Sequence, residues 1–335
     1  MRKNKKYNLA VVGVGVVGIQ MLRCLKGRNF PVNELRILAR RSRNIRVDGA
    51  TYKVKAISPD SFNGIDIALF AGTEGEKGAA VTFAPEAIKR GAVVIDNGAD
   101  FRLKPGVPLV IPEVNARDIK KHKGVIANPN CSTIQMVVAL WPLYQKVGIK
   151  KVIAATYQAV SGAGRNGISQ LESELRNKGV LEKKAFACKI AKNVIPHIGG
   201  FGELDYTSEE WKMVEETHKI MHDKKIKISA TCVRVPVITG HCEAIYIETR
   251  KPITASGARN ILSRAKGIRV VDDPRNSLYP LPIDSEGKNE VFIGRVRNTP
   301  FKGNGLWLWV VSDNLLKGAA LNTVQIAECL AMMNR

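Results

Sequence analysis

The chain has cysteines and histidines, but they do not fall into the common metal-binding motifs. The six cysteines form no Cys-x-x-Cys pair, and the five histidines form no His-Glu-x-x-His motif. These absences argue against the usual zinc sites and against a disulfide scaffold. We therefore expect a protein that holds no metal and resides in the reducing environment of the cytoplasm.

Acidic residues are scarce relative to basic ones. The chain has 30 Asp and Glu against 52 Lys and Arg, which gives a formal net charge of +22. The basic residues are scattered along the sequence, and no zinc-finger or RNP-type motif accompanies them. This pattern favours a lysine-rich solvated surface, and we expect no nucleic-acid partner.

Long apolar runs are also missing. The apolar stretch from Leu9 to Ile19 is interrupted by three glycines, and no small-residue cleavage site follows it. Neither a membrane span nor a secretory signal is predicted, and we expect no membrane partner. Gly/Ser-rich linkers and internal repeats are absent, while 335 residues with 45% hydrophobic content are enough for two domains.

The first 25 residues contain a glycine-rich motif. An apolar run, Tyr7 to Val12, predicts a strand, and Ile19 to Leu25 predicts a helix. Between them lies G-x-G-x-x-G, in which glycines permit a tight turn and a close approach of the backbone to a pyrophosphate. An ordinary Gly-rich turn is the alternative. The predicted nucleotide contacts in this loop are Gly13, Gly15, Val16, Val17 and Gly18.

Basic residues follow the second predicted strand, Leu35 to Ala39. The next residues are Arg40, Arg41 and Ser42, and no Asp or Glu occurs between Glu34 and Asp48. An acidic side chain here would hold a free ribose 2′-hydroxyl, whereas arginine suits a 2′-phosphate. The sequence therefore predicts NADP as the cofactor, unless these arginines only belong to the generally basic surface.

Further buried strands are predicted in the first 130 residues. The runs Ile65 to Ala71, Ala92 to Asp96 and Val125 to Ala127 are short and apolar, and Glu76 to Arg90 reads as a helix. Strands alternating with helices indicate an α/β architecture, here a Rossmann-like doubly wound nucleotide-binding domain.

A cysteine stands at the start of a predicted helix. Asn128-Pro129-Asn130 has turn and capping character, and Cys131 precedes the apolar run Ile134 to Trp141. The exposed amides of a helix N-terminus favour a thiolate, which is the reactive form of cysteine. A nucleophile and a buried structural cysteine are both compatible with this local pattern.

The second half of the chain is richer in β-type runs. They predict an α+β domain with a mixed or antiparallel sheet and helices on one face. The predicted strands are Lys151 to Gln158, Ile226 to Val237, Glu243 to Arg250, Val291 to Arg297 and Leu306 to Ser312. Ser161 to Gly164 is predicted to be a flexible loop. Helices are expected over Ile168 to Leu175, over Ser208 to Met221 with Ser208 as N-cap, and over Gly318 to Met333.

Several motifs together resemble one enzyme family along nearly the full length of the chain. They occur in the family's order, and the chain resembles aspartate-semialdehyde dehydrogenase. The matching segments are 13–18, 96–102, 111–115, 128–133, 156–164, 208–212, 280–282 and 313–328, with Arg234 and His241 seven residues apart. The glycine loop is one departure, with Val14 alone between its first two glycines. Asn97-Gly98-Ala99 is another, since it lacks the hydroxyl groups common before the phosphate-binding arginine.

The resemblance implies reductive dephosphorylation of L-4-aspartyl phosphate to L-aspartate 4-semialdehyde, in the biosynthesis of lysine, threonine, methionine and diaminopimelate. It implies a Cys131 nucleophile, a His241 acid/base and a Gln158 that orients the intermediate. The implied substrate contacts are Arg102 and Lys212 for phosphate, Arg234 for the α-carboxylate, Glu209 for the ammonium group, and Asn130.

The resemblance also implies domain boundaries and an assembly. Residues 1–130 and 316–335 would form the NADP-binding domain, and 131–315 the catalytic and dimerisation domain of a homodimer or homotetramer. Further cofactor contacts are implied at Gly72, Thr73, Ser161, Gly162 and Asn322. N-acetyl-glutamyl-phosphate reductase and a catalytically dead paralogue are the alternatives.

Overall fold

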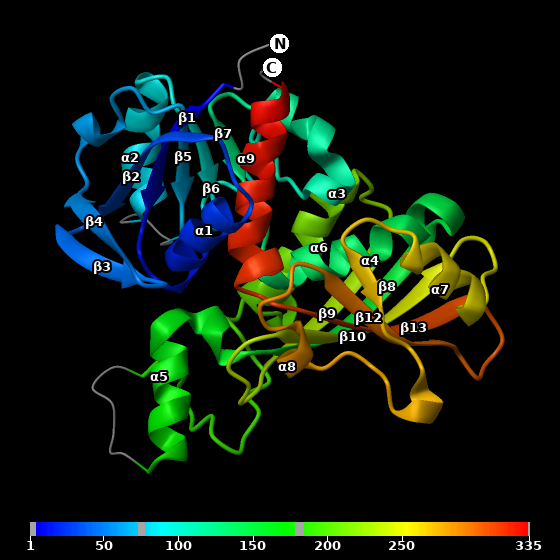
Figure 1. The fold of residues 1–335 in the computed structure, drawn as a ribbon. Coiled ribbons are helices and arrows are strands. Elements are labelled where there is room, and N and C mark those ends of the chain that lie inside the picture. The colour runs from blue at the N-terminus through cyan, green and yellow to red at the C-terminus, as the bar shows by residue number, and fades with distance from the viewer. Residues whose placement is uncertain (1–4, 73–77, 178–183, 334–335) are drawn as a thin grey trace. The chain divides into compact units, whose positions relative to one another are not determined.

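The chain folds into two compact units. The computed structural model describes residues 5–72, 78–177 and 184–333 (Figure 1). The first unit consists of Met1–Pro129 and Ala319–Arg335, and the second of Asn130–Gly318. The C-terminal helix therefore belongs to the same unit as the N-terminal strand.

A seven-stranded sheet forms the centre of the first unit. Its order is β3-β4-β2-β1-β5-β6-β7, and every neighbouring pair is parallel except the antiparallel β3–β4 pair at one edge. The strands in chain order are β1 (Tyr7–Val12), β2 (Val32–Ala39), β3 (Arg43–Val47), β4 (Ala50–Ala56), β5 (Ile67–Phe70), β6 (Val93–Asp96) and β7 (Val125–Ala127). This confirms the predicted doubly wound domain, because β1 lies beside both β2 and β5 and the chain builds the sheet outward in two directions.

Helices α1 (Val16–Gly27), α2 (Ala79–Lys89) and α9 (Leu321–Met333) pack on this sheet. The unit also contains α3 (Pro112–Asn115) and the short 3-10 turns η1 (Pro59–Phe62) and η2 (Ala116–Lys121). Helix α9 returns from the end of the chain to pack on α1, α3 and β6. The Tyr7 hydroxyl donates to the Ala331 carbonyl, and an Arg28–Glu328 ion pair adds a second tie between the two ends of the chain.

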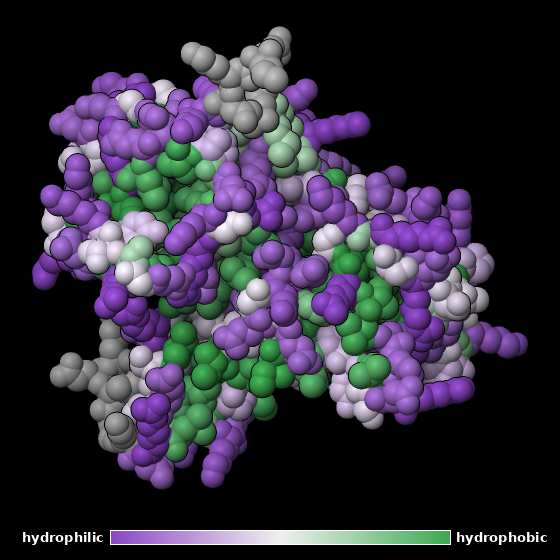
Figure 2. Space-filling view, viewed as in Figure 1, coloured by the Kyte–Doolittle hydropathy of each residue, from purple (hydrophilic) through white to green (hydrophobic). Residues whose placement is uncertain are grey.

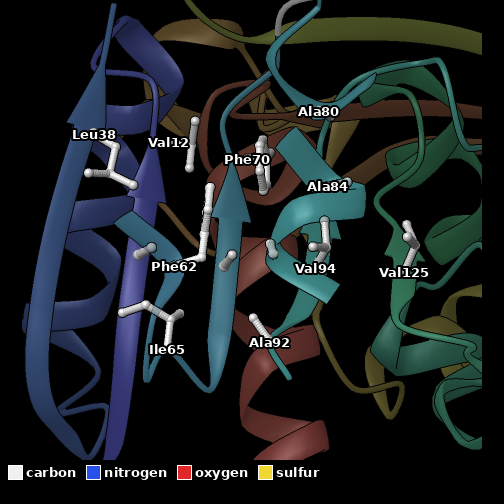
Figure 3. Packing of buried hydrophobic residues seen from close by; sticks show 13 residues of the cluster. Val12, Leu38, Phe62, Ile65, Phe70, Ala80, Ala84, Ala92, Val94 and Val125 are labelled. Atoms are coloured by element: carbon white, nitrogen blue, oxygen red, sulfur yellow. The ribbon is translucent and has the colours of Figure 1, made fainter. Parts of the chain in front are cut away.

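The core between α2 and the sheet explains why the central strands consist of uninterrupted apolar residues in the sequence. Phe62, Phe70 and Leu38 are fully buried there, and small residues such as Ala84 bring α2 close to the strands (Figure 3). Strands covered on both faces cannot alternate polar and apolar residues. The β3–β4 pair lies outside this core and alternates instead, which is why it was not predicted.

The second unit contains a six-stranded mixed sheet in the order β11-β12-β13-β10-β8-β9. The central pairs are antiparallel, and the two edge pairs, β11–β12 and β8–β9, are parallel. The strands are β8 (Ile149–Gln158), β9 (Lys227–Arg234), β10 (His241–Thr249), β11 (Ile268–Val270), β12 (Val291–Asn298) and β13 (Gly305–Ser312). The predicted α+β domain is confirmed.

Helices α4, α6 and α7 pack on this sheet. Residues that alternate along β8 are buried, whereas Ile153 and Tyr157 between them are exposed on the opposite face. The helical elements are α4 (Cys131–Val147), α5 (Gly164–Leu175), α6 (Ser208–Met221), α7 (Ala255–Ser263), α8 (Pro282–Ser285), η3 (Val160–Ala163), η4 (Glu203–Asp205) and η5 (Pro274–Asn276).

Two predicted segments differ from the structure. The predicted loop at Ser161 is a 3-10 turn, η3, which leads directly into α5, because Gly164 with φ +69° lets the chain turn without a break. The last helix begins at Leu321 rather than Gly318, since a π-helical turn, η6 (Leu316–Ala320), precedes it.

Hydrophilic residues cover most of the visible surface in Figure 2, in keeping with the large excess of charged lysines and arginines. Within the described part of the chain, no helix combines the length and hydrophobicity that crossing a membrane requires.

Candidate active site

Cys131 is the first residue of α4, as predicted. The preceding residue, Asn130, caps the helix with its side-chain oxygen, which accepts hydrogen bonds from the Ser132 amide at 3.0 Å and the Thr133 amide at 3.3 Å. Such a cap is worth about 1 kcal/mol. The half-buried thiol therefore sits at the positive end of a 17-residue helix, which favours the thiolate.

Two glutamates from α6 hold the residue before the nucleophile. Glu216 accepts the main-chain N–H of Asn130 at 2.7 Å, and Glu209 accepts the side-chain N–H of the same residue at 2.9 Å. Both carboxylates are buried. Together with the cap, these bonds fix the orientation of the Asn130 amide and hence the position of Cys131.

Glu216 was not predicted from the sequence. It lies seven residues after Glu209, and this spacing of two helical turns puts both side chains on one face of α6. The spacing alone could have suggested that Glu216 shares a helix face with Glu209. The contact with Asn130, however, joins residues 86 positions apart. Such a long-range contact has no local signal.

Glu209 is the centre of a polar network. Its carboxylate also accepts from the Gln158 amide at 3.1 Å and from the Lys212 ammonium at 3.4 Å. Burial alone would raise the pKa of Glu209, but the charge of Lys212 and the hydrogen bonds from Asn130 and Gln158 outweigh burial and lower it. Glu209 is therefore an ionised, buried carboxylate with a fixed direction.

The predicted N-cap of α6 is wrong by one residue. Thr207 caps the helix: its hydroxyl accepts from the Glu210 amide, and the Glu210 carboxylate accepts from the Thr207 amide. This reciprocal pair is a capping box, and its Thr-x-x-Glu signature is present in the sequence. Ser208 is instead the first residue within the helix.

Ala159 holds two side chains that come from the strands on either side of β8. Its carbonyl oxygen accepts from Arg234 Nη1 at 2.7 Å, and its N–H donates to His241 Nδ1 at 3.0 Å. Arg234 ends β9 and His241 begins β10, and both are buried. The structure thus brings the predicted Arg234 and His241 together at the end of β8.

The Arg234 guanidinium has unused hydrogen-bonding capacity. Its Nε is buried and has no hydrogen-bond partner among the described residues. Burial lowers the pKa of Arg234, while the nearby Glu209 and Cys131 raise it. With Nη1 held by Ala159, the Nε edge remains available for a carboxylate, and Cys131 lies within electrostatic range.

Gly162 and Asn314 also belong to the surroundings of Arg234 and His241. A Cβ added at Gly162 would lie 2.8 Å from Arg234 Nη1 and 3.3 Å from His241 Nε2, so only glycine leaves this space open. The Asn314 side chain accepts from the Gly240 amide at 3.0 Å and donates to the Ser161 hydroxyl at 2.9 Å. Asn314 was not predicted, because its contacts join three distant segments.

Gly318 links Asn314 to the nucleophile. A Cβ added at Gly318 would lie 3.0 Å from the Cys131 Cβ and 3.6 Å from the Asn314 Cβ. The predicted residues of the second unit therefore gather in one place: Asn130, Cys131, Gln158, Glu209, Lys212, Arg234 and His241.

A second buried acid lies two residues after His241 on the same face of β10. Glu243 is fully buried, and neither carboxylate oxygen has a hydrogen-bond partner among the described residues. Burial raises its pKa well above the ordinary value, while the nearby Gln135 side chain acts in the opposite direction. The sequence analysis did not single out Glu243.

The glycine loop of the first unit has the geometry that a pyrophosphate needs. Gly13 has φ +100°, and a Cβ at Gly18 would lie 1.9 Å from the Gly13 carbonyl oxygen, so both positions require glycine. A Cβ at Gly15 would meet nothing within 4 Å, and no side chain caps α1 there. The amides of Val16 and Val17 begin this uncapped helix, which suits an anion.

The remaining predicted cofactor residues are distributed over both units. Arg40, Arg41 and Ser42 are exposed just beyond the carboxyl end of β2, and the Ser42 hydroxyl accepts from the Ala56 amide. Gly72, with φ +85°, follows β5, and Thr73 lies outside the described residues. Ser161 and Gly162 belong to the second unit.

Arg102 and Asn322 are both anchored inside the first unit. Arg102 donates to the carbonyl oxygens of Asn128 and Asn97, each at 2.9 Å, at the carboxyl ends of β7 and β6. Asn322 donates to the Val110 carbonyl at 3.0 Å and to Asn128 Oδ1 at 2.7 Å. Their roles toward phosphate and cofactor stay predictions.

One pair of histidines has i,i+4 spacing, which puts both side chains on one face of a helix, so the expectation that the protein holds no metal needs a check against the structure. His218 and His222 lie at the end of α6, where His218 Nε2 is hydrogen-bonded to the Ile226 carbonyl. Over the described residues, no group of three or more His, Cys, Asp or Glu side chains could hold a metal ion.

Comparisons with known proteins agree on one family. Residues 8–122 match the family model described as semialdehyde dehydrogenase, NAD binding domain, and residues 140–317 match semialdehyde dehydrogenase, dimerisation domain. The chain is 51% identical to aspartate-semialdehyde dehydrogenase of Aquifex aeolicus (97% of this chain, 98% of the relative). It is 48% identical to the Bacillus subtilis enzyme of that name, with 98% of each chain covered.

A solved structure supports the same relationship. The crystal structure of aspartate semialdehyde dehydrogenase II complexed with ASA from Vibrio cholerae superposes with a TM-score of 0.92 and 44% sequence identity. The match covers 98% of this chain and 99% of that one. The likeness thus extends over both units.

Proposed function

The chain belongs to the aspartate-semialdehyde dehydrogenase family, and from this premise we propose that it reduces L-4-aspartyl phosphate to L-aspartate 4-semialdehyde with NADPH and releases phosphate. The observation that carries the proposal is Cys131 at the start of α4, beside a buried guanidinium. An acyl phosphate suits a thiolate nucleophile, because phosphate leaves readily and the resulting thioester accepts hydride.

The side chains around Cys131 match the charged groups of the substrate. Arg234 would bind the α-carboxylate with its free Nε edge, and Glu209 would accept the ammonium group. Asn130 and Gln158 orient the acyl group, while Lys212 and Arg102 would bind the phosphate. NADPH supplies the hydride when bound. The product would feed lysine, threonine, methionine and diaminopimelate synthesis, as the family resemblance implies.

The test is a comparison of two aldehydes. The enzyme should reduce NADP in a phosphate-dependent manner with aspartate semialdehyde, and should use N-acetylglutamate semialdehyde far less. Glu209 favours the first substrate, because its ionised, buried carboxylate suits a free ammonium group, which the acetylated substrate lacks. The reverse preference would identify an N-acetyl-glutamyl-phosphate reductase, and no turnover with either would support a dead paralogue.

We predict a preference for NADP over NAD, set by the end of β2. Arg40 and Arg41 are exposed there, and the described structure gives neither an ion pair. A 2′-phosphate would gain charge-assisted hydrogen bonds from them. Changing either to alanine should lower kcat/KM for NADPH by about 10-fold and leave that for NADH nearly unchanged. Arg46→Ala, on β3, is the control.

Equal use of NADPH and NADH by the parent enzyme would contradict this prediction. So would an unchanged preference in both the Arg40→Ala and Arg41→Ala variants, measured at fixed salt.

We also propose that the enzyme is a homodimer, or a homotetramer built from two dimers, that associates through the second unit. The outer face of its sheet exposes Ile153 and Tyr157, and two tryptophans, Trp307 and Trp309, are half-buried beside them. Apolar and aromatic residues on an uncovered sheet face are typical of an interface. Residues 1–130 and 316–335 would then serve the cofactor, and 131–315 catalysis and assembly.

Ile153→Asp should shift the protein toward monomer in light scattering coupled to size exclusion, because a buried charge without a partner destabilises an interface. Leu103→Asp is the matched control, since Leu103 is equally exposed but lies in the first unit. An unchanged oligomer in the Ile153→Asp variant would place the interface elsewhere.

Two further expectations concern the cell. We expect the protein to reside in the cytoplasm, and none of its six cysteines forms a disulfide. The basic surface is expected to bind no nucleic acid specifically, and a filter-binding titration over a range of salt concentrations checks this.

A further inference from the structure

We propose that Phe186 is a positioning residue for Arg234: its ring holds the plane of the guanidinium so that the Nε edge is presented to the α-carboxylate of the substrate. Phe186 lies in the irregular segment 184–195 of the second unit. The inference rests on the proposed function, and it adds a side chain that the motifs in the sequence did not single out.

The Arg234 guanidinium needs a second restraint. Among the described residues its side chain makes one hydrogen bond, from Nη1 to the Ala159 carbonyl at 2.7 Å, and Nε makes none. A single bond at one end leaves the plane free to turn about it. The Arg234 Cζ atom lies over the Phe186 ring, 5.7 Å from its centre, which is within the range of a cation–π contact. The ring therefore supplies the restraint on the plane.

The same segment also pairs with the main chain of Arg234. The Ile195 N–H donates to the Arg234 carbonyl at 2.9 Å, and the Arg234 N–H donates to the Ile195 carbonyl at 2.8 Å. Phe186 and Ile195 pack in one apolar cluster, to which Val160 and Leu171 also belong. One segment thus holds both the main chain and the guanidinium of Arg234.

Helix α5 fixes the main chain at Phe186. Gln170 is buried on this helix, and its Oε1 accepts the main-chain N–H groups of Ala185 at 2.8 Å and Phe186 at 3.0 Å. Its Nε2 donates to Glu174 Oε1 at 2.9 Å, one helical turn further along the same face. The position of Phe186 therefore does not depend on the packing of its ring alone.

Glu174 holds the segment at a second point. Its Oε2 accepts the main-chain N–H groups of Ile190 and Ala191, each at 2.8 Å. Burial would raise the pKa of Glu174, but the hydrogen bonds from Ala191, Gln170 and Ile190 outweigh burial and lower it. Hydrogen bonds to an ionised carboxylate are stronger than neutral ones, so the segment is firmly attached to α5.

A glycine on α5 makes room for the ring. A Cβ added at Gly167 would lie 3.3 Å from Phe186 Cζ and 2.3 Å from the Val160 carbonyl oxygen. The helix therefore lies against one edge of the ring while Arg234 lies over its face. A hydroxyl group at Cζ would collide with the helix, so tyrosine is not a conservative replacement here.

The first test removes the ring and keeps an apolar side chain, in the Phe186→Leu and Phe186→Met variants. We expect KM for aspartate semialdehyde to rise about 10-fold and kcat to stay within about 2-fold of the parent. Phe201→Leu is the matched control, because the Phe201 ring stacks on His197 rather than on an arginine. Thermal unfolding reports whether each variant is folded. An unchanged KM, or a fall in kcat with an unaltered KM, would overturn the proposal.

A double-mutant cycle separates positioning from general packing. In the Arg234→Lys background, Phe186→Leu should change KM by less than about 2-fold, because the planar Nε edge is already gone. A packing residue that acts independently of Arg234 would raise KM by the same factor in both backgrounds, and this result would also overturn the proposal.

A third measurement does not depend on turnover. In 4-bromobutyrate as many bonds separate the carboxylate from the reacting carbon as in aspartate semialdehyde, and 4-bromobutyramide is its neutral counterpart. The ratio of their alkylation rates at Cys131, followed by mass spectrometry of the Cys131 peptide, should fall about 3-fold or more in Phe186→Leu. The pH midpoint of alkylation by the amide should not move, because Arg234 keeps its charge.

An equal ratio of rates in the parent and Phe186→Leu would contradict the proposed role of Phe186. A parent enzyme without turnover of aspartate semialdehyde would instead refute the proposed function, while the ratio of alkylation rates would still test whether Phe186 positions Arg234.

Discussion

Cys131→Ala is expected to reduce turnover to background, a loss of about 10⁵-fold or more, while the fold and NADPH binding remain intact. The loss is large because the covalent route disappears entirely when the nucleophile is removed. The fold should persist because Asn130 rather than Cys131 caps α4, and alanine is a good helix former at this position. Steady-state kinetics and NADPH fluorescence titration provide the two readouts.

Cys24→Ala is the matched control. Cys24 also forms no disulfide, but it is buried in α1 as part of the apolar core of the first unit. It should cost about 1 kcal/mol of stability through lost packing and leave kcat unchanged. A Cys131→Ala enzyme that retains substantial activity would refute the covalent mechanism.

Arg234→Lys is expected to lower kcat/KM for aspartate semialdehyde by about 10²-fold, mainly through a higher KM. Lysine keeps the charge but loses the planar Nε edge that would bind the substrate carboxylate and the Nη1 bond to Ala159. One or two charge-assisted hydrogen bonds account for a loss of this size. The midpoint of Cys131 alkylation should move only slightly, since a cation remains nearby.

Arg250→Lys serves as the control, because Arg250 has an exposed side chain that pairs with Asp223 at 3.6 Å. Exposed pairs contribute little, so neither kcat nor KM should change appreciably. A loss in kcat with an unaltered KM in Arg234→Lys would show that Arg234 acts on the chemical step rather than on substrate binding.

The strands of the first unit could be predicted because burial on both faces leaves a simple pattern. Tyr7 to Val12 and Val125 to Ala127 match β1 and β7 to the residue. The hairpin β3–β4 was missed, since its alternating Arg, Thr, Tyr and Lys residues lie at an exposed sheet edge and resemble a loop. Edge strands carry a weaker hydrophobic signal than central ones.

The candidate site likewise contains some residues that the sequence could reveal and others that it could not. Cys131 at a helix start and the Glu209–Lys212 spacing could be recognised locally, because each depends on one helix. Glu216 and Asn314 could not be recognised in this way, because their roles depend on contacts with distant segments of the chain. The direction of the hydrogen bond at His241 Nδ1 is likewise a property of the folded chain.

The most direct test of the account is a single-turnover experiment in the reverse direction without phosphate. Aspartate semialdehyde and NADP are mixed with enzyme, and NADPH formation is followed by stopped flow. The account predicts a burst of up to one NADPH per subunit, an aspartyl thioester on the Cys131 peptide, and renewed turnover when phosphate is added. Absence of a burst, or a first hydride transfer that requires phosphate, would contradict the covalent route through Cys131.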